Sequence, residues 1–323
     1  MRFERVAGID KPISRILQGC MMMRAEKIDA GFALLDAAYQ RGINAFDTAH
    51  GYGLRTADRV LGAWVRSRGV ADEVVLLGKG CHPNEQGKRV RPENIAADIG
   101  DTLQRMDLPT LDLWAFHRDD PAVPVGELVD ACNAEINAGR IRAYGGSNWS
   151  LPRVNEARVY ARDHDLVPMT FTSPHFSLAE QIDSPFGDDC VTISGPSHVA
   201  ERDWHREHQV PAFAWSSLAR GFFSGAFGSS IAPALREGLD ANMLRCYGSD
   251  DNWQRLARAE ELAAERGWTV PQVALVWVLN QDFPVLAITG GQRPEEVTAN
   301  VTVADETLTP AEIAWLDLRT ERE

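Results

Sequence analysis

The chain has 323 residues, of which 44% are hydrophobic and 24% charged, the composition of a globular protein rather than a disordered or fibrous one. Its 33 Lys and Arg against 46 Asp and Glu give a formal net charge of −13, which disfavours nucleic acid and anionic membranes as partners. Five scattered cysteines without a C-x-x-C pair, and the lack of an apolar leader or a long apolar run, predict a reduced cytoplasmic protein that does not span a membrane.

Short apolar runs alternate with longer amphipathic stretches along the whole chain. The runs are residues 15–19, 44–48, 74–79, 111–117, 141–147, 168–173, 210–217 and 285–289. Between them, stretches such as 29–42, 57–69 and 94–106 carry apolar residues at helical spacing. Strands that alternate with helices in this way predict an α/β fold, a (β/α)8 TIM barrel. We expect a single domain over residues 1–323, with long loops at the C-terminal face of the barrel.

Two long segments interrupt this rhythm. The stretch from Leu218 to Asp251 is rich in glycine and serine and separates the seventh predicted strand from a helix expected near Trp253. An insertion of this length is typical of a lid or binding loop. The stretch from Ser177 to Pro196 contains "DSPFGDDC" and is expected to pack over the same end of the barrel.

Polar side chains follow neighbouring predicted strands. Asp47 ends the second strand, Lys79 the third and His117 the fourth, while Tyr52 lies in the loop after the second. In such barrels the C-terminal ends of the strands face the active site. A nearby ammonium lowers the pKa of a phenol, and an aspartate keeps that ammonium charged. His117 could donate a hydrogen bond to a substrate carbonyl, so the set predicts carbonyl reduction by hydride transfer, or the reverse oxidation.

Six motifs occur in order over nearly the whole chain. They are "FDTAHGYG", "LLGKG", "WAFHRDDP", "GGSN", "WSSLARGFFSG" and "TGGQRPEEVTAN". In combination they resemble the aldo-keto reductase superfamily. The resemblance implies a (β/α)8 barrel, a nicotinamide dinucleotide cofactor and a catalytic set of Asp47, Tyr52, Lys79 and His117.

The same resemblance implies a set of cofactor-binding residues. These are Ser147 and Asn148 at the carboxamide, Trp215 on the nicotinamide ring, Ser216, Leu218 and Arg220 at the pyrophosphate, and Gly290, Gln292, Arg293, Glu296 and Asn300 at the adenosine end. Ser173 stands where the family usually has a glutamine for the carboxamide. Glu296 stands where many members carry a neutral or basic residue and would repel a 2′-phosphate, whereas Arg293 would attract it. We expect NADP(H) to be preferred modestly, with NAD(H) also bound.

Other patterns in the sequence have simpler interpretations. His205 and His208 have a weak metal-ligand spacing in segment 198–208, but a solvated helical face explains them better, so no metal site is predicted. Cys81 is expected to line the site as a modestly exposed thiol. Neither a G-x-G-x-x-G nor a correctly spaced phosphate-binding loop occurs, so the dinucleotide is not expected to bind in Rossmann fashion.

Three functions fit the sequence to different degrees. A carbonyl reductase uses every residue of the predicted set. A cofactor-binding regulatory barrel with slow turnover resembles some members of the aldo-keto reductase superfamily. Such a protein has no need of Tyr52. A phosphate-binding isomerase or lyase is allowed by "TGGQR" but leaves Tyr52 and Lys79 unexplained. "HRDDP" resembles bacterial members linked to carbohydrate metabolism, which suggests an oxidised sugar as substrate. Pocket walls are expected to include Met21, Met22, Trp149 and Phe222, and the oligomeric state stays open.

Overall fold

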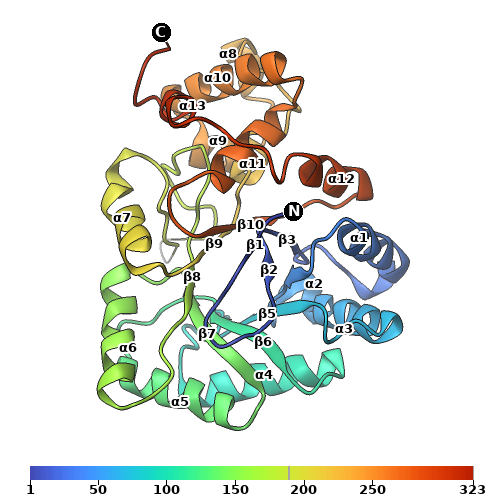
Figure 1. Ribbon diagram of the computed structural model, residues 1–323, viewed down its shortest axis with the longest axis vertical. Helices are drawn as coiled ribbons and strands as arrows, with labels where there is room; N and C mark the ends of the chain where they lie inside the picture. The colour runs from blue at the N-terminus through green and yellow to red at the C-terminus, as the bar shows by residue number, and fades with distance from the viewer. Residues whose placement is uncertain (188–189, 323) are drawn as a thin grey trace.

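The computed structural model describes residues 1–187 and 190–322, and its parallel strands close a barrel surrounded by helices (Figure 1). Each barrel strand pairs with the next one along the chain, and the last, β10, closes the ring between β3 and β9. The fold is a (β/α)8 TIM barrel, as predicted. In the predicted loop from Ser177 to Pro196, residues 188–189 lie outside the described part of the chain.

The barrel strands coincide with the predicted apolar runs. They are β3 Ile16–Gly19, β4 Ala45–Asp47, β5 Val75–Gly80, β6 Leu111–Phe116, β7 Ile141–Ser147, β8 Phe171–Ser173, β9 Ala212–Ala214 and β10 Val285–Thr289. Only β5 extends beyond its predicted run, to Gly80. The runs lack strict alternation because parallel strands are buried on both faces, one against the barrel interior and one against the helices.

Helices follow the strands and cover the outside of the barrel (Figure 1). The longer ones are α1 Ile28–Gln40, α3 Ala57–Arg68, α4 Pro92–Met106, α5 Val125–Asn137, α6 Leu151–Asp163, α7 Val199–His208, α10 Asp250–Arg266, α11 Val270–Leu279, α12 Pro294–Thr302 and α13 Pro310–Leu316. Helix α3 ends at Gly69, whose φ of +68° gives the left-handed cap that glycine adopts without strain.

A short N-terminal hairpin covers one opening of the barrel. Its strands, β1 Phe3–Glu4 and β2 Ile13–Ser14, pair antiparallel, and Val6, Ile9 and Ile13 belong to the apolar cluster that fills the barrel interior. Ser14 also bonds Asn44, just before β4 begins. The hairpin therefore closes the end where the strands start and leaves the C-terminal end for a site. Sequence analysis did not predict it, because such short strands carry no period.

The insertion between β9 and α10 is folded onto the barrel. It contains η3 Ala219–Gly221, α8 Pro233–Arg236 and α9 Ala241–Tyr247. Tyr247 is fully buried, and its hydroxyl lies 3.0 Å from Nε2 of His175. Helix α10 begins at Asp250, earlier than the expected start near Trp253, because Ser249 caps it. Within the described residues, no helix is long and apolar enough to cross a membrane.

Candidate active site

The barrel register sets three of the predicted catalytic residues side by side. Asp47 is the last residue of β4, and Lys79 lies near the end of β5, where it pairs with Ala115 of β6. His117 directly follows β6. Because adjacent parallel strands end at the same rim, an acid, a cation and an imidazole project from neighbouring strand ends.

The short helix α2, Tyr52–Arg55, brings the phenol to the same place through an unusual loop. Gly53 has a φ of +62°, and a Cβ there would lie 2.1 Å from the carbonyl oxygen of Met23, so only glycine fits. The His50 amide donates to the Lys79 carbonyl at 2.8 Å, and the Thr56 hydroxyl donates to the Gly53 carbonyl at 2.6 Å. The first bond joins the loop to β5, and the second stabilises the turn that follows Tyr52.

The side chains meet as the sequence predicted. The Lys79 ammonium donates a hydrogen bond to Asp47, and the two side chains are only 3% and 5% exposed. The Lys79 Nζ lies 5.0 Å from the centroid of the Tyr52 ring. The ring of His117 meets the Tyr52 ring edge-on, with centroids 5.5 Å apart. One compact cluster thus contains a buried ion pair, a phenol and an imidazole.

Burial and charge set the protonation states of this cluster. Burial raises the pKa of the Asp47 carboxyl, and Lys79 opposes that shift. Burial lowers the pKa of Lys79, but Asp47 and Tyr52 outweigh it and leave this pKa raised, so Lys79 is charged at neutral pH. Burial, aided by the Lys79 charge, lowers the pKa of His117 well below its usual range, so the ring is neutral.

The prediction that Tyr52 has a lowered pKa is wrong for the protein alone. Lys79 does lower the pKa of the phenol, as expected, but burial raises it by more, and the net direction is upward. Tyr52 therefore keeps its proton at neutral pH. A protonated phenol beside a fixed ammonium is the form that can donate a proton to an oxygen on which negative charge develops.

Several buried polar atoms at this rim have no hydrogen-bond partner among the described residues. They include Nδ1 of His117, Oγ1 of Thr48, Oε1 of Gln18 and Nε1 of Trp215. These residues come from the ends of β6, β4, β3 and β9. Buried polar groups are almost always paired in folded proteins, so unpaired atoms gathered at one rim fit a ligand with polar groups of its own.

The residues assigned to the carboxamide are bonded to one another. The Ser147 hydroxyl donates to the Ser173 carbonyl at 2.9 Å, and the Asn148 amide donates to the Ser147 hydroxyl at 3.1 Å and the His117 carbonyl at 3.2 Å. The Ser173 hydroxyl donates to the Phe213 carbonyl at 2.9 Å, away from the others. This chain of bonds links the end of β7 to the backbone of His117. A carboxamide would have to exchange with part of it.

The residues assigned to the ring and the pyrophosphate follow β9. Trp215 is partly exposed, with its ring edge-on to His175 at 5.0 Å between centroids. Ser216 and Arg220 have φ of +52°, and Ala219 has φ of +51°. Ala219 and Arg220 are therefore successive left-handed residues in the segment assigned to the pyrophosphate. Leu218 precedes η3 and packs partly buried against the core.

The adenosine-end residues lie around the start of α12. Arg293 is the N-cap of this helix, and its Nη2 lies 2.7 Å from Oε1 of Glu296. The backbone N–H of Gln292 donates to Oε2 of Glu296 at 2.8 Å. Gly290 has open space around it, and Asn300 is buried within the helix. Arg293 and Glu296, which were expected to act on a 2′-phosphate in opposite directions, form an ion pair with each other.

The sequence of residues 19–318 matches the Aldo/keto reductase family. The chain belongs to that family. Its curated relatives include proteins named as voltage-gated potassium channel β subunits. The one from Schizosaccharomyces pombe is 26% identical over 296 residues, 88% of this chain and 82% of that protein. The one from Oryza sativa is 25% identical over 319 residues, 94% of this chain and 92% of that protein.

Solved structures of two related proteins share the fold. An aldo/keto reductase from Klebsiella pneumoniae, in complex with NADP and acetate, has a TM-score of 0.68 and 23% identity, over 97% of this chain and 94% of the other. A glycerol dehydrogenase from Gluconobacter oxydans has a TM-score of 0.75 and 24% identity, over 99% and 97%. Membership of the aldo/keto reductase family supports an oxidoreductase with a nicotinamide cofactor.

Two residues of this aldo/keto reductase were missed by the sequence analysis. His82 meets the ring of His117 edge-on, with centroids 4.7 Å apart. Arg118 is 6% exposed and donates to the His117 carbonyl at 2.8 Å, and its charge lowers the pKa values of Tyr52 and His117. The segment "GKGCHP" contains His82 and the motif "HRDDP" contains Arg118, but only the fold shows that both contact His117.

Two interpretations of single residues are corrected by their burial. Cys81 is fully buried rather than modestly exposed, and burial raises the pKa of its thiol to about 12. His205 does not belong to a solvated face, since it is fully buried, lies within hydrogen-bonding distance of the Val210 carbonyl at 2.7 Å and has a pKa lowered to about 4 by burial. The described residues contain no cluster of His, Cys, Asp and Glu that could hold a metal.

The expected pocket walls divide into two groups. Met21 and Met22 are exposed, 44% and 51%, in the loop after β3. Trp149 and Phe222 are buried, so they pack beneath the surface of the rim and do not line an open pocket. Trp149 donates to the Arg118 carbonyl at 3.2 Å, which fixes the backbone next to His117.

Proposed function

We propose that this aldo/keto reductase reduces an aldehyde or ketone to the alcohol with NAD(P)H, and that Tyr52 is the general acid. The observation that carries the proposal is the cluster itself, in which the buried Lys79–Asp47 pair lies beside the Tyr52 phenol and the neutral His117 ring. A bound nicotinamide would supply the hydride to the carbonyl carbon. An oxidised sugar is the substrate class we propose to test first, on the strength of "HRDDP".

Each residue has a task in this proposal. The neutral His117 donates one N–H to the carbonyl oxygen and holds it near the phenol. As negative charge builds on that oxygen, Tyr52 transfers its proton to it. Lys79 stabilises the phenolate that is left, and Asp47 keeps Lys79 charged and in place. In the reverse oxidation the same phenolate accepts the alcohol proton.

The cofactor residues support NADP(H) over NAD(H) by a modest factor. Arg293 is 72% exposed and Glu296 39% exposed, so their ion pair is weak and can exchange for a 2′-phosphate. The N-terminus of α12 would add to the attraction. The displaced Glu296 carboxylate would oppose it, which leaves room for real binding of NAD(H).

A cofactor-binding regulatory barrel with slow turnover is the second candidate. The names of the two curated relatives, potassium channel β subunits, favour it. The complete catalytic cluster favours the enzyme, because a protein that only binds the cofactor needs no proton donor beside Lys79.

Turnover separates the two candidates. NADPH and NADH are mixed with the protein and a panel of aldehydes, ketones and oxidised sugars, and the near-ultraviolet absorbance of reduced nicotinamide is followed. Multiple turnovers with at least one carbonyl compound are expected. Tight NADPH binding by tryptophan fluorescence quenching without multiple turnover on any compound would support the regulatory barrel instead.

We infer that a small carbonyl compound is the main partner and that nucleic acid and membranes are not, because of the net charge of −13. The cytoplasm is the proposed compartment, since Cys20, Cys81, Cys132, Cys190 and Cys246 are free thiols.

A further inference from the structure

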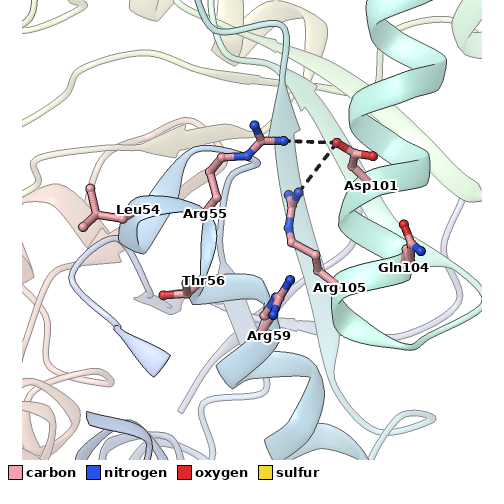
Figure 2. Close-up of a pocket in the computed structure, with 7 residues that line it drawn as sticks. All are labelled: Leu54, Arg55, Thr56, Arg59, Asp101, Gln104 and Arg105. Atoms are coloured by element: carbon pink, nitrogen blue, oxygen red, sulfur yellow. Dashed lines mark hydrogen bonds and ion pairs between the residues drawn. The ribbon is translucent and has the colours of Figure 1, made fainter. Parts of the chain in front are cut away.

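A hollow on the outside of the barrel lies between the Tyr52 loop and helices α3 and α4. It has a volume of about 430 Å³, and Arg55, Arg59, Asp101 and Arg105 are in its wall (Figure 2). A second hollow of about 560 Å³ shares Arg59 and Arg105 with it and adds Arg66. We call the two together the α3–α4 groove.

The lining of the α3–α4 groove is rich in arginine. Of its charged residues, Arg55, Arg59, Arg66 and Arg105 are cations and Asp101 is the acid. Figure 2 shows the guanidinium groups of Arg55 and Arg105 directed toward Asp101, with Arg59 beside them on α3. Because the chain as a whole has a net charge of −13, this local excess of cations indicates a site for an anion.

Internal contacts use only part of this charge. Arg105 uses Nε and Nη2 on Asp58, at 2.8 and 2.7 Å, which leaves Nη1 at 3.7 Å from Asp101. Arg55 Nη2 lies 3.2 Å from Asp101, and both side chains are about half exposed, 59% and 47%. Such exposed pairs are weak. A phosphate could replace Asp101 as the partner of Arg55, while Asp101 keeps its contact with Nε2 of His50 at 3.2 Å.

Two side chains in the groove have no partner at all within the described residues. Neither the guanidinium of Arg59 nor the amide of Gln104 makes a hydrogen bond or ion pair there, and both are exposed. Arg66 contacts Asp107 at 3.3 Å, but that acid is 78% exposed. The groove therefore contains hydrogen-bond donors of Arg59 and Gln104 that are available to a ligand.

We propose that the α3–α4 groove binds the phosphate group of a small phosphorylated molecule. A phosphate monoester carries about −1.5 to −2 charges at neutral pH and three strong acceptor oxygens, which suit several guanidinium groups at once. The first hollow, about 430 Å³, falls within the roughly 300–1,000 Å³ of small-molecule sites. Gln104 and Thr56 would meet hydroxyl groups of the organic part, and Val60 and Ala63 its carbon atoms.

The groove is separate from the proposed catalytic site but touches the loop that carries Tyr52. Arg55 ends α2, and Arg105 Nη2 donates to the His50 carbonyl at 3.2 Å. His50 in turn bonds the Lys79 carbonyl through its amide. A ligand in the groove would thus contact the side chains that hold this loop from outside, whether or not the chain reduces carbonyl compounds.

Isothermal titration calorimetry of the full chain at low ionic strength tests the proposal. The probes are glycerol 3-phosphate, inorganic phosphate and glycerol. We expect saturable binding of glycerol 3-phosphate, weaker binding of inorganic phosphate, and no binding of glycerol. Added NaCl should weaken the binding, because the contacts are ionic and exposed. Absent binding of glycerol 3-phosphate, or equal affinity for inorganic phosphate, would overturn the assignment to an organic phosphate.

Matched arginine variants locate the bound phosphate. Arg59→Ala should weaken glycerol 3-phosphate at least about tenfold, the loss expected for one charge-assisted hydrogen bond. Arg5→Ala removes the same charge from an exposed position outside the groove and should change nothing. Arg293→Ala, at the proposed cofactor site, should also leave this affinity unchanged. If Arg293→Ala abolishes binding and Arg59→Ala does not, the groove is not the site; a chain that fails to turn over carbonyl compounds leaves this result untouched.

Discussion

The catalytic end and the adenosine end of the proposed site each contain an ion pair, but the two pairs differ in burial. Lys79 and Asp47 are 3% and 5% exposed, and they come from neighbouring barrel strands. Arg293 and Glu296 are 72% and 39% exposed and lie within one turn of α12. The first pair is fixed by the barrel, whereas the second depends on two flexible side chains in water.

This difference separates chemistry from selection. A buried pair cannot be opened without leaving a charge unpaired in a low dielectric, so the catalytic end is held in one arrangement before any ligand arrives. An exposed pair contributes little and can be exchanged. We infer that the catalytic end sets the reaction, while the adenosine end sets only how strongly one cofactor is preferred over another.

The largest effect is expected from Tyr52→Phe. This change keeps the ring that packs against His117 and removes only the hydroxyl. General acid catalysis contributes roughly 100-fold to 10,000-fold, so kcat for carbonyl reduction should fall by that factor with cofactor affinity unchanged. Steady-state kinetics and fluorescence titration of NADPH measure the two quantities. A variant that reduces a good substrate at the parent rate would remove Tyr52 from the mechanism.

Thermal stability tests the difference in burial directly. Asp47→Asn leaves the Lys79 ammonium buried without its counter-charge, which should cost about 3–5 kcal/mol of unfolding free energy. Glu296→Gln breaks the exposed pair and should cost at most about 1 kcal/mol. Chemical denaturation of both variants at neutral pH gives the comparison. Equal losses of unfolding free energy in the two variants would show that burial does not make the Lys79–Asp47 pair more important for stability than the Arg293–Glu296 pair.

Lys79→Met should move the pH dependence of reduction. Reduction needs the protonated phenol, so activity is present below the pKa of Tyr52 and is lost as the pH rises through it. Lys79 lowers this pKa, so its removal should carry the basic limb of the kcat profile to higher pH, with a lower maximum rate. Profiles of parent and variant on the same substrate provide the measurement. An unmoved basic limb would show that Lys79 does not act on Tyr52.

The barrel could be predicted because its signals are local and repeated. Apolar runs and helical periods alternate along the chain, and all barrel strands lie in the predicted runs apart from the last residue of β5. The N-terminal hairpin could not be predicted in this way. Its strands are two residues each. The reason for the apolar residues Val6, Ile9 and Ile13 is seen only in the fold, where they pack against the barrel interior.

The proposed catalytic residues could be predicted to lie close together, because the strand ends of a barrel meet at one rim. How deeply these residues are buried could not be predicted. The net pKa of Tyr52 depends on how much water the fold removes, and the sequence shows only the charges. The same holds for Cys81, predicted as partly exposed and found fully buried. The Arg293–Glu296 pair was missed because the two side chains were each considered against a phosphate and not against each other.

The smallest effect concerns the choice of cofactor at the exposed end. A 2′-phosphate on Arg293 would gain about 1.5 to 3 kcal/mol from a charge-assisted hydrogen bond. It would lose the Arg293–Glu296 contact, roughly 0.2 to 1 kcal/mol for an exposed pair, and meet the freed carboxylate at a cost on the order of 1 kcal/mol. The balance lies between about −0.5 and about 1.8 kcal/mol, and its midpoint favours NADPH by a few-fold, roughly threefold.

Two variants should therefore shift this preference in opposite directions. Arg293→Ala should erase or invert the preference, because it removes the attraction and leaves the Glu296 carboxylate near the phosphate. Glu296→Gln should increase the preference by up to about tenfold, because it removes the repulsion and keeps an acceptor of the same shape. Titration of both reduced cofactors by tryptophan fluorescence quenching measures the ratio of dissociation constants. If the parent binds NADH more tightly, or if Glu296→Gln weakens NADPH relative to NADH, then the exchange of Glu296 for a 2′-phosphate does not occur. Glu296 would in that case bind the ribose hydroxyls. These hydroxyls are uncharged, so its carboxylate does not repel them, and they can donate hydrogen bonds to it.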